Sequence, residues 1–374
     1  MSASGTAIAR FMIAELKGGG NSAADLLRPE TTALMRTPQA GGIEPLNHML
    51  LGFYESSTPG HRAIAHAGAL IWSHTDLRLY VDDGVGIFVA FNSQGRNQIS
   101  RSFRNQVINP FAERYLPPAS APAACLDGTA KDAQLMAGVY QTTRRFESSF
   151  ASFVNLLSAT TFRALPDGHL IQEPSYDLNG APITYCEIGP MVWRNVNGWQ
   201  QIAPKIVDGK VVRIGLDTPY AAYEPVPWQK SPVWLLPALI VSLVVILLTA
   251  LQWPVAGAIK RYYHISTINP PRFIRASQIS AVVVSIVTLV WLWLKDNVSG
   301  FSNQGIDALF FSIQLVTLLV IPCALGAAAW RLVAVWRSDT GWISTIWSVF
   351  FAMAIAVFVW AVVVFHLATL SLIY

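Results

Sequence analysis

The chain has 374 residues, of which 53% are hydrophobic and 13% are charged, and its formal net charge is +4. That length allows two or three domains, but the composition is too apolar for a purely soluble protein. The small positive charge gives no sign of a basic patch, so no nucleic-acid partner is expected. The three cysteines, Cys125, Cys186 and Cys323, are widely spaced, and whether the first two pair depends on the fold.

Residues 1–17 predict an amphipathic helix of a globular domain. Apolar side chains recur at helical spacing, Ser4 is a suitable N-cap, and the glycines at 18–20 would end the helix. Arg10 interrupts the apolar run, so no export signal is expected here. A short helix that begins at Pro29 should follow.

A β-hairpin is the central feature of the next segment. The alternating residues 75–81 place Leu77 and Leu79 on one face of a strand and charged side chains on the other. The Asp-Asp-Gly turn at 82–84 favours a hairpin, because glycine adopts a positive φ without steric cost. The apolar residues 85–92 should then form an interior strand that is covered on both faces.

A helix is expected after the hairpin. Ile99, Phe103, Val107 and Phe111 recur every fourth residue, which is typical of a helix that covers a sheet with one apolar face. Pro110 lacks a backbone N–H and should break or restart this helix.

A small all-β domain is predicted over residues 133–228, after a Pro- and Ala-rich linker at 118–132. Short β-type runs there are separated by regularly spaced glycine turns. Tyr140, Trp193 and Trp199 are expected to be core or cross-strand aromatics, and a ligand-binding face is the alternative.

Residues 231–374 predict four transmembrane helices, with spans at 233–259, 276–294, 308–330 and 343–372. These spans contain no Asp, Glu, Lys or Arg, which argues against an ion or proton transporter. Basic residues concentrate in the first and third loops: Lys260, Arg261, Arg272, Arg275, Arg331 and Arg337. The positive-inside rule therefore places those loops in the cytoplasm and residues 1–230 outside it, in the periplasm where an outer membrane exists.

Several of these segments together resemble the C-terminal part of serine hydrolases related to class C β-lactamases and penicillin-binding proteins. The matching motifs are His66-Ala67-Gly68, the strand at 72–77 and the hairpin at 84–95. The opening segment looks like a family segment that lies well past the nucleophile. The resemblance implies that residues 1–117 form part of an α+β domain, an antiparallel sheet with covering helices, and that the β domain also has counterparts in some members.

The family's chemistry needs a Ser-x-x-Lys motif, a Tyr-x-Asn or Ser-x-Asn loop, and a Lys- or His-x-Gly strand. The chain has neither of the first two motifs. By resemblance, His66 and Gly68 occupy the third motif, with His66 beside the substrate or the nucleophile and the amide near Ala69 in the oxyanion hole. A hydrogen-bonded strand histidine without chemistry is the alternative for His66.

No metal or cofactor site is expected. His61, His66 and His74 match no metal-ligand spacing, and Gly20-Asn21-Ser22-Ala23-Ala24 lacks the second glycine of a Gly-x-Ser-x-Gly nucleophile motif.

The functional expectation is a membrane-anchored, extracytoplasmic serine-hydrolase-like protein. The resemblance implies hydrolysis of an ester, amide, peptide or β-lactam substrate through an acyl-serine. Without the nucleophile we expect the chain alone to be inactive, a truncated or degenerate form that has lost its front. The alternative is a non-catalytic binding or regulatory membrane protein that uses the residual sheet and the β domain. The bilayer is the expected partner in either case.

Overall fold

A computed structural model describes residues 3–18, 27–39, 42–58, 60–70, 72–93, 100–176, 180–264, 270–297, 307–338 and 341–371. The chain divides into two compact units. The first comprises Met1–Arg144 and Thr160–Pro225, and the second comprises Arg145–Ala159 and Val226–Tyr374. Each unit is described by itself.

The N-terminal part of the first unit contains a four-stranded antiparallel sheet of order β1-β2-β3-β4. The strands are β1 (Tyr54–Glu55), β2 (Ala63–Ala69), β3 (His74–Tyr80) and β4 (Val85–Phe91). The predicted hairpin is confirmed: Tyr80 pairs with Val85 across the turn, and Gly84 has a φ of 66°. A positive φ is the conformation for which the sequence needs glycine at this position.

Helices cover both faces of this sheet. Helix α1 (Gly5–Leu16) packs its apolar side chains near Ile64 and Leu79 on one face, and the Ser4 side chain caps it by accepting a bond from the Ala7 N–H, as predicted. Helix α2 (Pro29–Met35) starts at Pro29, also as predicted. Helix α3 (Ser100–Tyr115) lies on the opposite face. Of the three glycines expected to end α1, Gly18 has a positive φ and the other two lie outside the described residues.

Two expectations about this sheet are wrong. Strand β4 has helices on both faces but stands at the end of the strand order, so it is an edge strand and not an interior one. Helix α3 continues through Pro110 without a break. Proline removes one hydrogen bond of the helix, and here Ala112 and Leu116 remain packed on the sheet beyond it.

The buried face of α3 is also displaced by one position from the prediction. The side chains buried on that face are Arg104, Ile108, Ala112 and Leu116, whereas Val107 is 36% exposed. Ile99 and the side chain of Phe103 lie outside the described residues. The four-residue spacing was read correctly, but its register was not.

A closed eight-stranded antiparallel barrel forms the rest of the first unit, in the order β10-β11-β12-β5-β6-β7-β8-β9. Its strands are β5 (Gly138–Thr142), β6 (Thr160–Ala164), β7 (Leu170–Tyr176), β8 (Pro182–Gly189), β9 (Val192–Asn195), β10 (Gln201–Val207), β11 (Lys210–Leu216) and β12 (Ala222–Pro225). The short helix α4 (Ala130–Met136) contributes Met136 to the core. Tyr140 and Trp193 are buried in the barrel interior, as predicted, whereas Trp199 lines a surface cavity.

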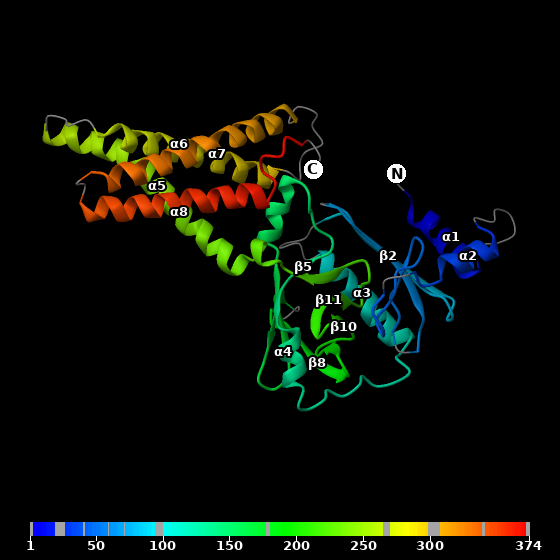
Figure 1. Cartoon of the computed structure of the whole chain (residues 1–374). Helices are drawn as coiled ribbons and strands as arrows, with labels where there is room; N and C mark the ends of the chain where they lie inside the picture. Colours follow the sequence, from blue (N-terminus) through cyan, green and yellow to red (C-terminus); the bar gives the residue numbers. More distant parts are fainter. Residues whose placement is uncertain are drawn as a thin grey trace. The chain divides into compact units, whose positions relative to one another are not determined.

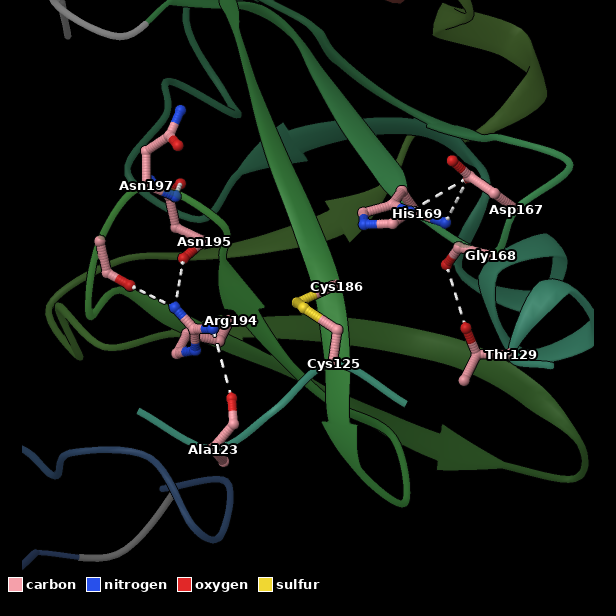
Figure 2. Close-up of a disulfide and its surroundings, with 11 residues drawn as sticks. Ala123, Cys125, Thr129, Asp167, Gly168, His169, Cys186, Arg194, Asn195 and Asn197 are labelled. Carbon is pink, nitrogen blue, oxygen red and sulfur yellow. Dashed lines mark hydrogen bonds and ion pairs between the residues drawn. A yellow bond between two sulfur atoms is a disulfide. The ribbon is translucent and has the colours of Figure 1, made fainter. Parts of the chain in front are cut away.

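A disulfide joins Cys125, in the segment before the barrel, to Cys186 on β8 (Figure 2). The pairing left open by the sequence is therefore made by the fold. Beside it, Arg194 donates hydrogen bonds to the carbonyls of Asn195, Gly198 and Ala123 at 3.0–3.3 Å. The bonds to Asn195 and Gly198 stabilise the β9–β10 turn. The bond to Ala123 holds the segment before the barrel against that turn.

The second unit is a bundle of four long helices: α5 (Pro232–Tyr263), α6 (Arg272–Asn297), α7 (Asp307–Trp336) and α8 (Trp342–Val364). Each of them is long and apolar enough to cross a membrane. Helix α5 packs against α6 and α8, and α7 packs against the same two helices (Figure 1). The prediction of four membrane-spanning segments is thus confirmed at the level of helix length and composition.

A short insertion between β5 and β6 belongs to the helical unit. It contains the 3₁₀ helix η2 (Phe150–Leu156), whose Phe150 ring lies 4.6 Å from the Phe310 ring. Ser152 donates a hydrogen bond to the Phe365 carbonyl. The sequence reading placed this segment within the β domain, because nothing local marks it as a cover for the bundle.

Two helix ends differ from the predicted spans. Helix α8 ends at Val364, eight residues before the predicted limit at 372, and His366 follows it with a φ of 57°. Helix α7 extends past the predicted limit at 330 to Trp336 and so includes Arg331, which is buried. The helix therefore extends beyond the charge-free segment predicted at 308–330.

Candidate functional site

His66 lies on β2, where the strand leaves the core. Residues Ala63, Ile64 and Ala65 are buried, whereas His66 is exposed. Its backbone pairs with Leu77 of β3, and its ring lies 6.5 Å from the Tyr54 ring. The charge of His66 also acts on the Asp76 carboxyl. The exposed imidazole is accessible to a ligand, but the sequence contains no Ser-x-x-Lys motif to supply the expected nucleophile.

Gly68 follows on the same strand face and is closely approached by β3. A Cβ atom at this position would lie 2.7 Å from Thr75 Oγ1. The Gly68 carbonyl accepts a 3.0 Å hydrogen bond from Arg104 of α3, which also donates to the Thr75 carbonyl at 2.6 Å. Close strand packing therefore accounts for the glycine, and any part in chemistry stays a prediction for both Gly68 and His66.

The opposite face of the same strands carries a buried charged cluster. Asp76 and Arg78 are 4% and 8% exposed, and their side chains approach to 3.9 Å. Burial raises the pKa of Asp76, and the nearby positive charges of Arg78 and Arg104 partly offset that rise. The strand alternation read from the sequence is confirmed, but these charged side chains are buried rather than exposed to solvent.

A polar cavity of about 440 Å³ lies elsewhere in the first unit, between α3 and the β9–β10 turn of the barrel. Its walls include Arg78, Glu113 and Trp199, together with the backbone turn that Arg194 holds in place. An aromatic ring beside charged and amide side chains suits a polar ligand with one apolar face.

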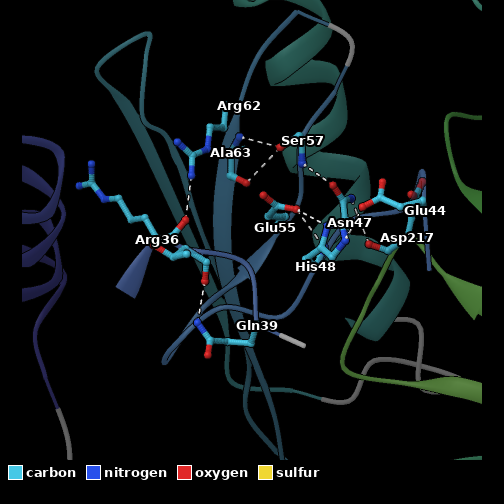
Figure 3. Close-up of polar contacts among 11 residues, drawn as sticks. Arg36, Gln39, Glu44, Asn47, His48, Glu55, Ser57, Arg62, Ala63 and Asp217 are labelled. Atoms are coloured by element: carbon cyan, nitrogen blue, oxygen red, sulfur yellow. Dashed lines mark hydrogen bonds and ion pairs between the residues drawn. The ribbon is translucent and has the colours of Figure 1, made fainter. Parts of the chain in front are cut away.

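Asn47 and Asp217 connect the two walls of this cavity. The Asn47 amide donates to the Asp217 carbonyl at 3.1 Å, and its Oδ1 accepts from the Ser57 N–H (Figure 3). Asp217 Oδ2 accepts a 2.7 Å bond from the Gln201 N–H, and burial raises the pKa of this carboxyl to about 6. Sequence reasoning missed this cluster, because 170 residues separate Asn47 from Asp217 and neither lies in a recognisable motif.

The histidines are dispersed. His61 bonds Asp83 and the Pro117 carbonyl, both at 3.0 Å, while His74 is buried on β3. One group with metal-ligand potential exists among the described residues, namely Cys125, His169 and Cys186. Its two sulfurs are joined in the disulfide and so cannot act as thiolate ligands (Figure 2). His169 pairs with Asp167 at 3.1 Å. The Gly-x-Ser-like segment at 20–24 lies outside the described residues.

No family model and no curated protein matches this chain. Among solved structures, the chain is similar to SurE with D-Leu, at 14% identity and a TM-score of 0.34, over 57% of this chain and 48% of that one. It is also similar to the octameric penicillin-binding protein homologue from Pyrococcus abyssi, at 11% identity and a TM-score of 0.24, over 59% and 46%. The chain spans about half the length of these structures, and TM-scores below 0.5 assign no fold family.

Proposed function

We propose that this protein is a membrane-anchored, extracytoplasmic member of the β-lactamase and penicillin-binding type of serine hydrolases. Its site lacks the Ser-x-x-Lys motif that carries the nucleophile. The observation that carries the proposal is the position of His66, exposed, and of Gly68, half-buried, on a strand of an antiparallel sheet that is followed by the expected hairpin. The resemblance in sequence motifs assigns the site its chemistry, which is acyl transfer from an ester, amide or β-lactam.

An extracytoplasmic location of the first unit is part of this proposal. Disulfides persist in oxidising compartments, and the Cys125–Cys186 bond belongs to this unit. The excess of Lys and Arg at the α5–α6 and α7–α8 ends of the bundle supports the same orientation through the positive-inside rule.

We expect the purified full chain to have no hydrolase activity. A serine nucleophile must be activated by a neighbouring base, and the sequence contains no Ser-x-x-Lys. Hydrolysis of a chromogenic cephalosporin and of p-nitrophenyl esters should therefore equal that of a matched His66→Ala variant. A fluorescent penicillin should leave no covalent label. Turnover that a serine-directed inhibitor abolishes would overturn the expectation of inactivity and point to a nucleophile outside the known motif.

A second function, non-catalytic binding of a cell-wall fragment, is favoured by the polar cavity that contains Trp199. Calorimetric titration with soluble muropeptides would show saturable binding that Trp199→Ala weakens. Trp228→Ala is the matched control, because this exposed tryptophan lies outside that cavity. Equal affinity in wild type and both variants would exclude the cavity as the binding site.

A further inference from the structure

Arg331 is a buried cation inside the helical bundle. It lies five residues before the end of α7, which at 1.5 Å per residue is roughly 8 Å from the helix terminus. Its exposed fraction is 3%. A charged side chain in an apolar helix bundle is costly unless a compensating group is present, and such residues commonly mark functional sites.

Two serine hydroxyls orient the guanidinium without neutralising it. Arg331 Nε donates to Ser348 Oγ at 3.0 Å, and Nη1 donates to Ser277 Oγ at 2.8 Å. The single hydrogen of each hydroxyl is already used: Ser277 donates to the Ile274 carbonyl and Ser348 to the Ser344 carbonyl. Both oxygens therefore act as acceptors toward Arg331. Within the described part of the bundle, no carboxylate contacts this guanidinium.

A cavity of about 500 Å³ opens beside Arg331. Its wall includes Gln252 of α5 and the first turn of α8, from Gly341 to Ser344. The N-cap residue Gly341 has no side chain to cap this helix start, and the first N–H groups and the positive end of the dipole attract an anion. Trp347 completes the wall, and its indole N–H is fixed by a 3.1 Å bond to Thr249.

Arg331 supplies a positive charge and the start of α8 supplies N–H donors, and the cavity wall is built from three helices, α5, α7 and α8. We propose that this cavity binds a phosphate group, with Arg331 as its cationic ligand and the start of α8 as its second donor. Arginine suits phosphate because its planar guanidinium can offer two parallel N–H groups. The phosphate could be that of an anionic phospholipid headgroup or free inorganic phosphate. The exposed, apolar residues Trp342 and Ile343 at the mouth suit a lipid.

Calorimetric titration of the detergent-solubilised full chain tests this site with two probes, dioctanoyl phosphatidylglycerol and sodium phosphate. A single-site isotherm with the lipid alone would identify a headgroup site, and binding of both probes would identify a site for phosphate itself. In either case Arg331→Gln should weaken binding at least tenfold. Arg331→Lys keeps the positive charge but loses the two parallel N–H groups of the guanidinium, and it should weaken binding less.

Arg337→Gln is the matched control, since it removes a positive charge from the exposed end just past the same helix and leaves the cavity intact. The Ser277→Ala, Ser348→Ala double variant keeps the charge while removing its orientation, and should weaken binding severalfold even if Arg331→Gln fails to fold. No saturable heat with either probe would overturn the proposal. So would equal weakening by Arg331→Gln and Arg337→Gln, which would indicate general attraction to basic charge.

Discussion

At the scale of single residues, Asp217 shows most clearly how burial changes chemistry. It follows β11, and its carboxyl receives one hydrogen bond from the Gln201 N–H. Burial outweighs that bond and raises the carboxyl pKa to about 6. An unfolded aspartate releases its proton near pH 4, so the folded protein binds more protons than the unfolded chain between about pH 4 and 6.

The free energy of unfolding should therefore fall as pH rises through that window. Asp217→Asn removes the ionisable group but keeps an oxygen that can accept from Gln201. We expect the variant to be more stable than wild type at pH 7.5, on the order of 2 kcal/mol, and equal to it at pH 4. Denaturant unfolding of the full chain in detergent at the two pH values measures this difference.

Asp208→Asn provides the control, because Asp208 is an exposed turn residue with a positive φ that asparagine tolerates. It should leave stability unchanged at both pH values. An Asp217→Asn variant that is less stable at pH 7.5 would contradict the assigned cause of the pKa rise.

His66 and Gly68 show what a motif can and cannot predict. Their strand, their pairing partners and the following turn were readable, since alternation and Asp-Gly turns are local properties. The tight contact of Gly68 with Thr75 and the bridging bonds of Arg104 were not, because they depend on α3 packing across two strands.

At the scale of elements, the disulfide closes the barrel against the segment that precedes it. Cys125 and Cys186 are 61 residues apart, and linking them restricts the unfolded chain. Replacing both with serine should lower the stability of the first unit by about 4 kcal/mol, as expected for a loop of this length. Unfolding of the full chain, followed with and without the substitutions, measures the loss.

Cys323→Ser is the matched control, since Cys323 is a free cysteine of α7. It should not alter the unfolding of the first unit. Alkylation without reductant should modify one cysteine in the native protein and three after reduction. Three reactive thiols before reduction would show that the bond is not formed in the cell.

Helix α3 illustrates the limit of periodicity. A four-residue spacing was present in two adjacent stripes, one apolar in sequence and one that contains Arg104. The fold buried the second stripe, in which Arg104 donates to two strand carbonyls and the apolar side chains of Ile108, Ala112 and Leu116 are buried. The apolar spacing alone therefore predicted the wrong buried face for α3.

At the scale of the whole molecule, the four apolar helices make the chain a candidate multi-pass membrane protein. The charge distribution predicts its orientation, with the α5–α6 and α7–α8 ends in the cytoplasm. In a Cys323→Ser background, a membrane-impermeant maleimide should label Lys205→Cys, on the barrel surface, in intact cells. It should label Tyr263→Cys, at the end of α5, only after permeabilisation. The reverse pattern would invert the topology.

The sequence by itself determined the four apolar helices, the hairpin, the start and N-cap of α1, the start of α2, and the absence of a Ser-x-x-Lys motif. These properties depend on composition, on periodicity over a few residues, or on local turn chemistry. Tertiary structure alone decided the Cys125–Cys186 pair, the cavity at Asp217 and the burial of Arg331. Each of these brings together residues that are far apart in the chain, and their contacts are fixed by packing, which local patterns do not encode.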